Sequence, residues 1–357
     1  MNSPRVSICL PNLNNRAFLP DRMESIYSQT LRDWELIIVD DFSSDGAWEF
    51  FQKCQKSDSR ISLFRGPRKG LYPGWNDAIR RARGEFIYIA TSDDTMSADF
   101  LEKTVDALSV HRDCELAHAV IRPIDAEGND INLHYYHSGA FMASSGDLCK
   151  FPHVRVAPFD GLMHLLGHTV YLSITQLLMR RSLFQHVGYF SDRWGPIGDF
   201  HWAMRATLVS NTIHVPDTWG SWRIHSSQAT TERKSDDHQK RIQMMIDDAI
   251  QVSRGKLPGD LNTCIDRWAD YFLVKHGWWN TGEGRLARLR LIVHDFLSGS
   301  LAARHYVAHK LGFGRMWEMN DIDLIRSICA SVGIKETLIK CPKGNRDQSQ
   351  DFIAERR

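Results

Sequence analysis

Short apolar runs alternate with amphipathic stretches over the first part of the chain. The runs are rich in β-branched and aromatic residues and predict strands at 6–10, 35–40, 61–65 and 85–90. Between them the spacing is helical, and in the last such stretch Trp75, Ile79 and Ala82 fall on one face, with Gly84 expected to end the helix. This alternation predicts an α/β fold whose mostly parallel, Rossmann-like sheet carries helices on both faces.

The pattern changes after about residue 120. It predicts a further strand at 116–123, a strand and short helix within 173–190, a helix at 199–209, and two short strands at 211–216 and 220–225. From about Ser235 onward we expect the strands to stop and helices to follow, with a polar tail at the end. We therefore expect one domain over residues 1–230, with halves at about 1–120 and 121–230, and a helical C-terminal region over 231–357.

Two of the predicted strands end in adjacent carboxylates. Asp40 and Asp41 follow ELIIV, and Asp93 and Asp94 follow EFIYIATS. Ligands of parallel sheets bind beyond the carboxyl ends of the strands, so both pairs are expected at one edge. The second pair suits a divalent cation bound together with substrate phosphates. A plainer alternative is that Asp93 or Asp94 caps a helix beginning near Ser97.

The first acidic pair also has two interpretations. A carboxylate of Asp40 or Asp41 could accept a hydrogen bond from a nucleotide base, or it could cap a helix that opens at Gly46 or Ala47. The chain has no GxGxxG or GxxxxGKS phosphate loop, so a dinucleotide or P-loop site has no support.

Composition narrows the partners and the compartment. The 357 residues carry a formal net charge of +1, which argues against a nucleic-acid partner. Seven scattered cysteines fit reduced thiols better than a disulfide framework. No apolar run is long enough for a signal peptide or a membrane span. We therefore expect a cytoplasmic protein, with peripheral attachment to the inner face of the membrane left open.

Four segments, in this order and spacing, resemble one known family. They are VSICLPNLNN, QTLRDWELIIVDDFSSDG, GLYPGWNDAI and EFIYIATSDD, and they resemble the nucleotide-sugar-binding half of inverting glycosyltransferases of family 2, which have the GT-A fold. The likeness covers about the first 110 residues and continues more loosely to about Thr230. It implies a UDP- or dTDP-sugar donor, a glycan or lipid-linked glycan acceptor, and a divalent metal, Mn²⁺ or Mg²⁺.

The resemblance also implies a role for each matching residue. It places Asp199, in GPIGDFHW, as the general base, and Asp93 and Asp94 as the metal-binding pair. It implies diphosphate contacts for Arg223 and His225, and nucleotide contacts for Pro11, Asn14, Asp40, Asp41, Asn76 and Asp93. Inverting transfer needs a base to deprotonate the acceptor hydroxyl and cations to hold the departing diphosphate, so this set is chemically sufficient.

Simpler roles remain for some of these residues, and the sequence departs from the family pattern. Asp199 could cap the helix at 199–209, and His225 could be an ordinary histidine at a strand end. Thr91 stands where relatives often have the first acid of the metal motif, and Gly198 stands where the base is often preceded by another acid. Leu13 and Trp75 replace an aromatic residue and an arginine, respectively. A non-catalytic nucleotide-sugar- or glycan-binding module therefore remains the alternative function.

Acceptor specificity is expected from the loop over about 125–168 and from the C-terminal helices. Tyr135, Tyr136 and Phe141 could stack on sugar rings or pack against the sheet. The sequence RLARLRLIVHDFL, from Arg285, predicts a basic amphipathic helix that could rest on an anionic membrane. Equally, its apolar stripe could pack on the catalytic domain or on a second subunit of a homo-oligomer.

Overall fold

The computed structural model describes residues 3–131, 140–226, 238–266, 268–269, 271, 285–313 and 319–341. The strands are β1 (Val6–Asn12), β2 (Trp34–Asp40), β3 (Ile61–Arg65), β4 (Phe86–Ile89), β5 (Cys114–Ile124), β6 (His153–Arg155), β7 (Leu177–Arg180), β8 (Asn211–Arg223) and β9 (Leu338–Lys340). The helices are α1 (Leu19–Tyr27), α2 (Ala47–Ser57), α3 (Leu71–Arg81), α4 (Phe100–Val110), α6 (Ala140–Ser145), α7 (Phe159–Leu165), α8 (Leu183–Val187), α9 (Gly198–Val209), α10 (His238–Ser253), α12 (Arg285–Leu297), α13 (Leu301–Lys310) and α14 (Asp321–Ser331). Short 3₁₀ turns are η1 (Gly146–Lys150), η2 (Ile174–Gln176) and η3 (Asp192–Ile197).

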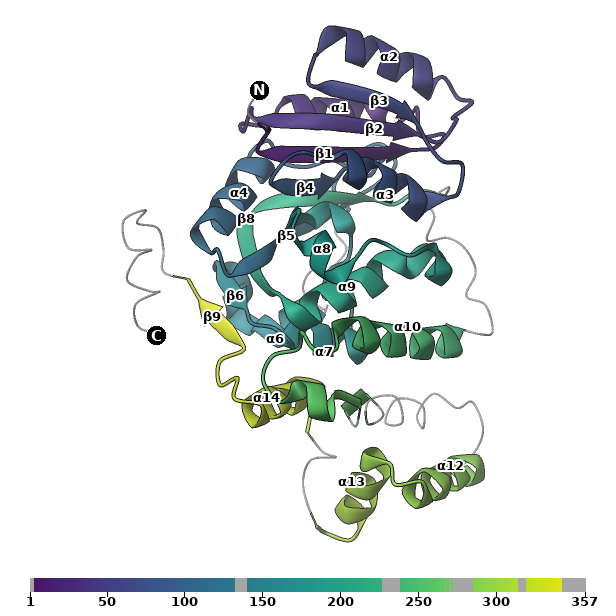
Figure 1. The fold of residues 1–357 in the computed structure, drawn as a ribbon, viewed down its shortest axis with the longest axis vertical. Coiled ribbons are helices and arrows are strands. Elements are labelled where there is room, and N and C mark those ends of the chain that lie inside the picture. The colour runs from purple at the N-terminus through teal and green to yellow at the C-terminus, as the bar shows by residue number, and fades with distance from the viewer. Residues whose placement is uncertain are drawn as a thin grey trace.

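All nine of these strands form one sheet in the order β3-β2-β1-β4-β7-β5-β8-β6-β9 (Figure 1). The first four are parallel, so β1, β2 and β4 end at the same edge. Beyond β4 the sheet is mixed, because β7 runs antiparallel to both of its neighbours while β5 and β8 are parallel to each other. The parallel half is the α/β alternation that the sequence predicts.

Helices cover both faces of the sheet, and alternate residues of each strand point to opposite sides. In β1, Ile8 and Leu10 pack in the core that contains α1, α2 and α4. Cys9 packs in the opposite core, with Trp75 and Ile79 of α3 and with residues of α7 and α9. The predicted shared face of Trp75, Ile79 and Ala82 is confirmed, since all three are buried in this second core.

Two features differ from the predictions. The two short strands predicted at 211–216 and 220–225 are one strand, β8, whose pairing with β5 shifts register where Val215 is followed by Trp219. The register shift lies near Pro216, where the strand pattern of the sequence is interrupted, so the sequence predicts two strands instead of one. The α3 helix ends at Arg81, earlier than Gly84, because Ala82 adopts an extended conformation.

The C-terminal region is mostly helical, as expected, but it returns one strand to the sheet. β9 pairs antiparallel with β6, so the prediction that strands stop after Ser235 is wrong. The strand is only Leu338–Lys340, too short for a periodic signal to stand out.

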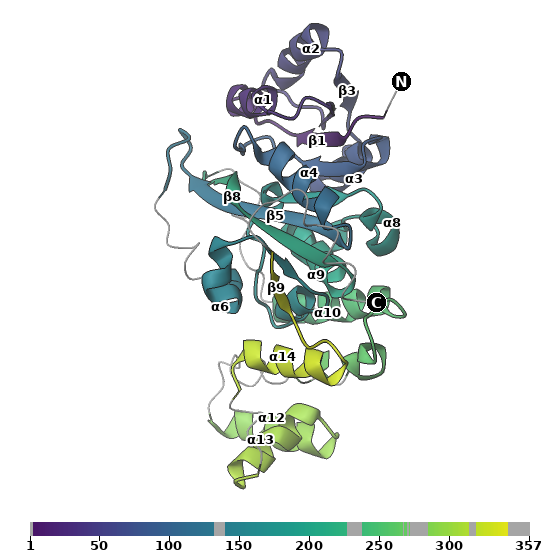
Figure 2. The same ribbon diagram turned by 90° about the vertical axis from the view of Figure 1, so that its left-hand side faces the viewer.

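The C-terminal helices occupy two different settings. Residues of α10 and α14 join the core shared with α7 and α9. In contrast, α12 and α13 lie at the end of the molecule farthest from α2 in both views (Figures 1 and 2). None of the helices in the described ranges has the length and apolar character that crossing a bilayer requires.

Candidate donor and catalytic site

The carboxylate of Asp40 is fully buried and fully bonded at the end of β2. Asn12, its register partner on β1, donates from Nδ2 at 2.9 Å. Ser43 donates from both its hydroxyl (2.6 Å) and its amide (3.1 Å), and Arg65 donates from Nη1 at 2.8 Å. Asp40 therefore organises the loop after β2, and its role in nucleotide binding stays a prediction.

The loop after β1 links the two acidic strand ends. On the β2 side, the Asn14 amide donates to Ser43 Oγ at 2.9 Å, and Asn14 Oδ1 accepts from the Ser44 amide at 2.8 Å. On the β4 side, Asn15 Nδ2 donates to Ser92 Oγ at 2.7 Å. The two pairs of acids lie at the ends of β2 and β4, on either side of β1 and at the same edge, which is the arrangement that the sequence predicts.

Strained backbone gathers at this edge. Within the described residues, the non-glycine residues with positive φ are Asn14 (53°), Phe42 (64°) and Arg68 (54°), which follow β1, β2 and β3, respectively. Asp41, next to Phe42, accepts a 2.6 Å bond from the Arg68 amide at Oδ1. Such strain persists where the surrounding structure fixes it, and it often marks a binding site. The three loops therefore mark this edge as a candidate binding site.

Asp93 and Asp94 differ sharply in their environments. Asp94 is buried, and its two oxygens accept bonds from the Arg223 amide (2.6 Å) and from Thr91 Oγ1 (2.5 Å). Burial, followed by the neighbouring charge of Asp93, raises the pKa of Asp94 to about 7. Asp93 is more exposed, and its Oδ2 lies 3.0 Å from Nε2 of His225. A dication bound here would relieve the repulsion between the two carboxylates.

The Arg223 guanidinium is 1% exposed and lies within the protein. Its Nε donates to the Asp93 carbonyl at 2.6 Å, its Nη1 to the Ala126 carbonyl at 2.8 Å, and its Nη2 to Asp21 at 3.0 Å. His225 packs on Phe18, with ring centroids 4.7 Å apart. In this conformation Arg223 ties the end of β8 to the acidic pair, and diphosphate binding by Arg223 and His225 stays a prediction.

Arg22 is a residue of this site that the sequence does not reveal. It is buried on α1, where its Nε donates to the Thr91 carbonyl at 2.8 Å and its Nη2 to the Tyr88 hydroxyl at 3.3 Å. Its positive charge lowers the pKa of Asp94 and so opposes the larger effect of burial. Arg22 stands in an ordinary amphipathic helix, where an arginine predicts a solvent-exposed position.

Asp199 lies in the first turn of α9, and Tyr72 of α3 holds it. The Tyr72 hydroxyl lies 3.2 Å from Asp199 Oδ1, accepts from the Asp199 amide at 3.0 Å, and reaches the Pro196 carbonyl at 3.0 Å. Burial raises the pKa of Asp199, which suits a carboxylate that must accept a proton. A Cβ on Gly198 would lie 2.5 Å from the Tyr72 ring. Tyr72 thus occupies the space next to Gly198, where relatives often carry an acid.

The remaining predicted nucleotide contacts lie around the same edge. Pro11 is within β1, next to its end, and Leu13 is exposed just beyond it. Asn76 is buried on α3, where its amide donates to the Phe190 carbonyl at 2.8 Å and accepts from the Phe190 amide at 3.1 Å. Trp75 is core. The Asn76 amide thus joins α3 to the segment that leads to Asp199, and its nucleotide contact stays a prediction.

The structure decides against the helix-cap alternatives for the two acidic pairs, but not for Asp199. The helix after Asp93 and Asp94 is α4, which begins at Phe100, too far along for either acid to cap it. The α2 helix is preceded by Gly46 without a side-chain cap. Asp199 is within α9, which begins one residue earlier, and its Oδ1 accepts a bond from the Phe200 amide at 2.8 Å, so its side chain does satisfy an amide of the first turn. A capping role therefore does not account for the acids that end β2 and follow β4, whereas for Asp199 it is compatible with the predicted role as a base.

The predicted aromatic acceptor loop is only partly described. Tyr135 and Tyr136 lie outside the described residues. Phe141 is buried, with its ring 4.9 Å from that of His118 and 4.6 Å from that of His214. Phe141 thus packs against the sheet, which was the plainer of its two interpretations.

The residues present fit a divalent cation. Two adjacent carboxylates follow β4, one of them with a raised pKa, and hard cations such as Mg²⁺ and Mn²⁺ bind through one or two carboxylates plus phosphate oxygens. Over the described part of the chain, no cluster of three or more His, Cys, Asp or Glu forms a complete protein cage. The fit is therefore to a cation shared with a phosphate-bearing substrate.

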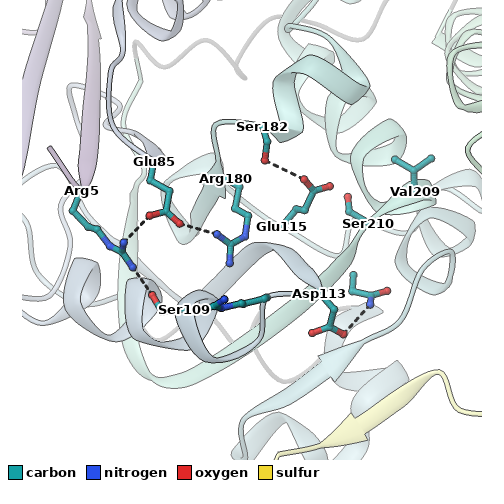
Figure 3. A pocket seen from close by; sticks show the side chains of 11 residues that line it. Arg5, Glu85, Ser109, Asp113, Glu115, Arg180, Ser182, Val209 and Ser210 are labelled. Atoms are coloured by element: carbon teal, nitrogen blue, oxygen red, sulfur yellow. Dashed lines mark hydrogen bonds and ion pairs between the residues drawn. The ribbon is translucent and has the colours of Figure 1, made fainter. Parts of the chain in front are cut away.

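A cavity of about 760 Å³ lies at the amino ends of β1, β4 and β8, where Arg5, Glu85 and Asn211 line it (Figure 3). Its charges pair within the wall: Glu85 lies between Arg5 (2.6 Å) and Arg180 (2.9 Å). A smaller cavity of about 250 Å³ is lined by Lys69, Asn76 and Phe190, among others. Only the smaller cavity adjoins α3, the helix that carries Tyr72, so size alone does not locate the chemistry.

Comparisons with known proteins show the family and the fold of the chain. Residues 7–188, just over half of the chain, match the model of glycosyl transferase family 2. The chain belongs to this family. It is 35% identical over 109 residues to a UDP-Glc:α-D-GlcNAc-diphosphoundecaprenol β-1,3-glucosyltransferase of Escherichia coli, which covers 30% of this chain and 42% of that one. It is 33% identical over 95 residues to a GalNAc(5)-diNAcBac-PP-undecaprenol β-1,3-glucosyltransferase of Campylobacter jejuni, covering 26% and 31%.

A third relative is an uncharacterized glycosyltransferase of Haemophilus influenzae, 31% identical over 134 residues, with 37% of this chain and 53% of that one covered. The matched segments thus span about half or less of the relatives' own lengths. The family that the comparisons show is the one that the four sequence segments resemble.

Solved structures confirm the GT-A-type fold of the chain. Staphylococcus aureus TarS 1–349 in complex with UDP-GlcNAc superposes with a TM-score of 0.57 at 15% identity, covering 76% of this chain and 72% of that one. The mannosyltransferase PcManGT of Pyrobaculum calidifontis, in complex with GDP-Man and Mn²⁺, gives a TM-score of 0.52 at 20% identity, covering 94% and 89%. The predicted fold class, including the C-terminal helical region, is confirmed.

Proposed function

We propose that the protein is a metal-dependent inverting glycosyltransferase that moves a sugar from a UDP- or dTDP-sugar to a hydroxyl group of a glycan or lipid-linked glycan. The observation that carries this proposal is the pairing of two carboxylates at the end of β4 with a separate buried carboxylate, Asp199, on α9. Family membership supports glycosyl transfer as the reaction class.

Asp199 is the general base of the proposed reaction. Its carboxylate takes the proton of the acceptor hydroxyl while that oxygen bonds to the anomeric carbon of the donor. The bond from the anomeric carbon to the diphosphate breaks, and the nucleoside diphosphate leaves with the electron pair. Burial raises the pKa of Asp199, and the Tyr72 hydroxyl holds one of its oxygens in place, so the base is both stronger and fixed in orientation.

Asp93 and Asp94 would hold the metal, Mn²⁺ or Mg²⁺, which neutralises charge on the leaving diphosphate when it is bound. The protein prepares this position with a short bond from Thr91 and with the backbone amide of Arg223, which fix the Asp94 carboxylate. A mannosyltransferase of similar fold was solved with Mn²⁺, which supports the choice of metal.

The relatives' names support the substrate classes. One names a UDP-glucose donor and an undecaprenol-diphosphate-linked acceptor, and a second also names an undecaprenol-linked glycan. TarS was solved with UDP-GlcNAc. We extend a UDP-type donor and a lipid-linked acceptor to this chain as part of the proposal, with the reaction at the cytoplasmic face of the membrane.

The test is a panel of nucleotide sugars, incubated with the full chain in Mn²⁺, Mg²⁺ or EDTA. Wild type is compared with Asp94→Ala and with a matched control, Asp130→Ala, which removes an exposed acid of a surface ion pair. We expect slow, metal-dependent release of nucleoside diphosphate from one donor, abolished by Asp94→Ala alone. Turnover in EDTA would discard the metal role, and binding of a donor without any release or transfer would favour the non-catalytic binding module.

A further inference from the structure

An apolar stripe is uncovered on α12. The positions recur at i, i+3, i+7, i+10 and i+11, which places them on one side of the helix. Its outermost members are 77% and 78% exposed, and the full set is Leu286, Leu289, Val293, Phe296 and Leu297. An exposed stripe of this kind marks an interaction surface, because single soluble domains rarely leave contiguous large apolar side chains in water.

The stripe is not the face by which α12 joins the rest of the protein. Ile292, which is buried, packs with Ala303 and Tyr306 of α13. The two helices thus form a hairpin, and the apolar side chains on its inner face pack against each other. Figures 1 and 2 both place this hairpin at the end of the molecule, so the sequence-based alternative of a stripe packed on the catalytic domain is not what the structure shows.

The hairpin is strongly basic. Residues 285–313 contain five Lys or Arg and one acidic residue, a net charge of +4, whereas the whole chain carries +1. Arg290, Arg304 and Lys310 are exposed. Two further large apolar side chains, Leu311 and Phe313, are exposed just after α13. Apolar side chains beside a concentrated positive charge complement a surface that is both anionic and apolar.

We propose that the α12–α13 hairpin docks the protein on an anionic lipid surface, with the α12 stripe inserted among the lipid chains. A second copy of this chain is a poorer occupant, because two hairpins of net charge +4 would repel each other. Docking places the enzyme where a lipid-linked acceptor resides. That purpose rests on the proposed function, but the docking itself does not.

The experiment is co-sedimentation of the full chain with phosphatidylcholine vesicles, with and without phosphatidylglycerol. We expect binding only to the vesicles that contain phosphatidylglycerol, weakening as salt rises. Leu289→Asp combined with Phe296→Asp should weaken binding by at least about tenfold, because it removes two inserted side chains and adds two negative charges. The control is Leu291→Asp, on the opposite side of α12 and 37% exposed, which should change binding much less.

Two results would overturn the proposal. One is equal binding of wild type and the double variant to anionic vesicles. The other is a wild-type dimer in sedimentation velocity that the double variant dissociates, which would assign the stripe to a second copy. Release of nucleoside diphosphate from the donor without acceptor, together with the unfolding temperature, reports separately on the active site and on folding. Loss of vesicle binding with both unchanged supports docking, whatever becomes of the proposed function.

Discussion

The acidic edge of the sheet and the α12–α13 hairpin treat charged and apolar groups in opposite ways. At the edge, charged groups are buried and bonded: Asp40 accepts four hydrogen bonds, and Arg223 donates to the carbonyls of Asp93 and Ala126 and to the Asp21 carboxylate. At the hairpin, large apolar groups face solvent. The charged groups of the edge are thus held by bonds within the protein, whereas the exposed apolar side chains of the hairpin are available to the lipid surface that we propose. In this protein, buried charged groups with many hydrogen bonds indicate the candidate active site, and exposed apolar side chains indicate a surface that binds a partner.

The strongest test of the proposed catalytic mechanism is Asp199→Asn. The amide keeps the shape but cannot accept the proton, so kcat for transfer should fall by roughly 10²–10⁴-fold. Donor binding should stay unchanged, which calorimetry with the nucleoside diphosphate would check. Full turnover in this variant would remove Asp199 from the mechanism.

Arg223→Met tests whether the edge depends on its internal bonds. The change leaves the Asp93 and Ala126 carbonyls without a donor, so the free energy of unfolding should fall by about 1–3 kcal/mol. The control is Arg122→Met, which removes an exposed pair with Asp130 and should cost well under that. Denaturant unfolding measures both. A raised KM for the donor with unchanged stability would instead support direct diphosphate binding by Arg223.

The raised pKa of Asp94, about 7, predicts how metal affinity depends on pH. Only the ionised carboxylate binds the cation, so affinity for Mn²⁺ in the presence of UDP should fall roughly tenfold per pH unit below about 7 and level off above it. Without metal, folding stability depends on pH in the opposite direction. The native state holds this proton more tightly than the unfolded chain, so stability should decline as pH rises from about 4 to about 7 and level off above it.

Calorimetric titration and thermal unfolding across this range check both statements. Asp93→Asn removes the neighbouring charge, so the pKa of Asp94 should fall and the midpoint of both curves should move to lower pH. A midpoint that does not move would mean that the two carboxylates are not coupled.

Tyr72→Phe is a smaller perturbation of Asp199. The hydroxyl bond lowers the pKa of Asp199, so its removal should shift the acidic limb of the kcat profile to higher pH and reduce kcat by about tenfold or less. Tyr189→Phe, at an exposed tyrosine, is the control. A uniform loss of activity without a shift in the pH profile would reduce Tyr72 to a packing role.

The smallest effect is expected at the hairpin when no membrane is present. Leu289→Asp should change the free energy of unfolding by no more than about 0.5 kcal/mol, because the side chain is exposed. Turnover of the nucleotide sugar in free solution should also be unchanged. A large destabilisation measured by denaturant unfolding would show that the stripe is internal packing, and the contrast between the two regions would fail.

The sequence determined the parallel half of the fold and its acidic edge. Strands such as 35–40 are short apolar runs that end abruptly in acids, and both the periodicity and the stop are local properties. Parallel strands on either side of β1 then bring Asp40 and Asp94 to one edge by topology alone. The candidate base was predictable only through the order of the whole motif set.

The tertiary structure decided what each charge does. The burial of Arg22 beneath Thr91, the raised pKa of Asp94 and the hold of Tyr72 on Asp199 all depend on residues far apart in sequence. The same is true of β9, whose three residues form a strand only because β6 offers an open edge. Periodicity reports which side chains avoid water, but partners and local dielectric are set by elements that meet only in the folded chain.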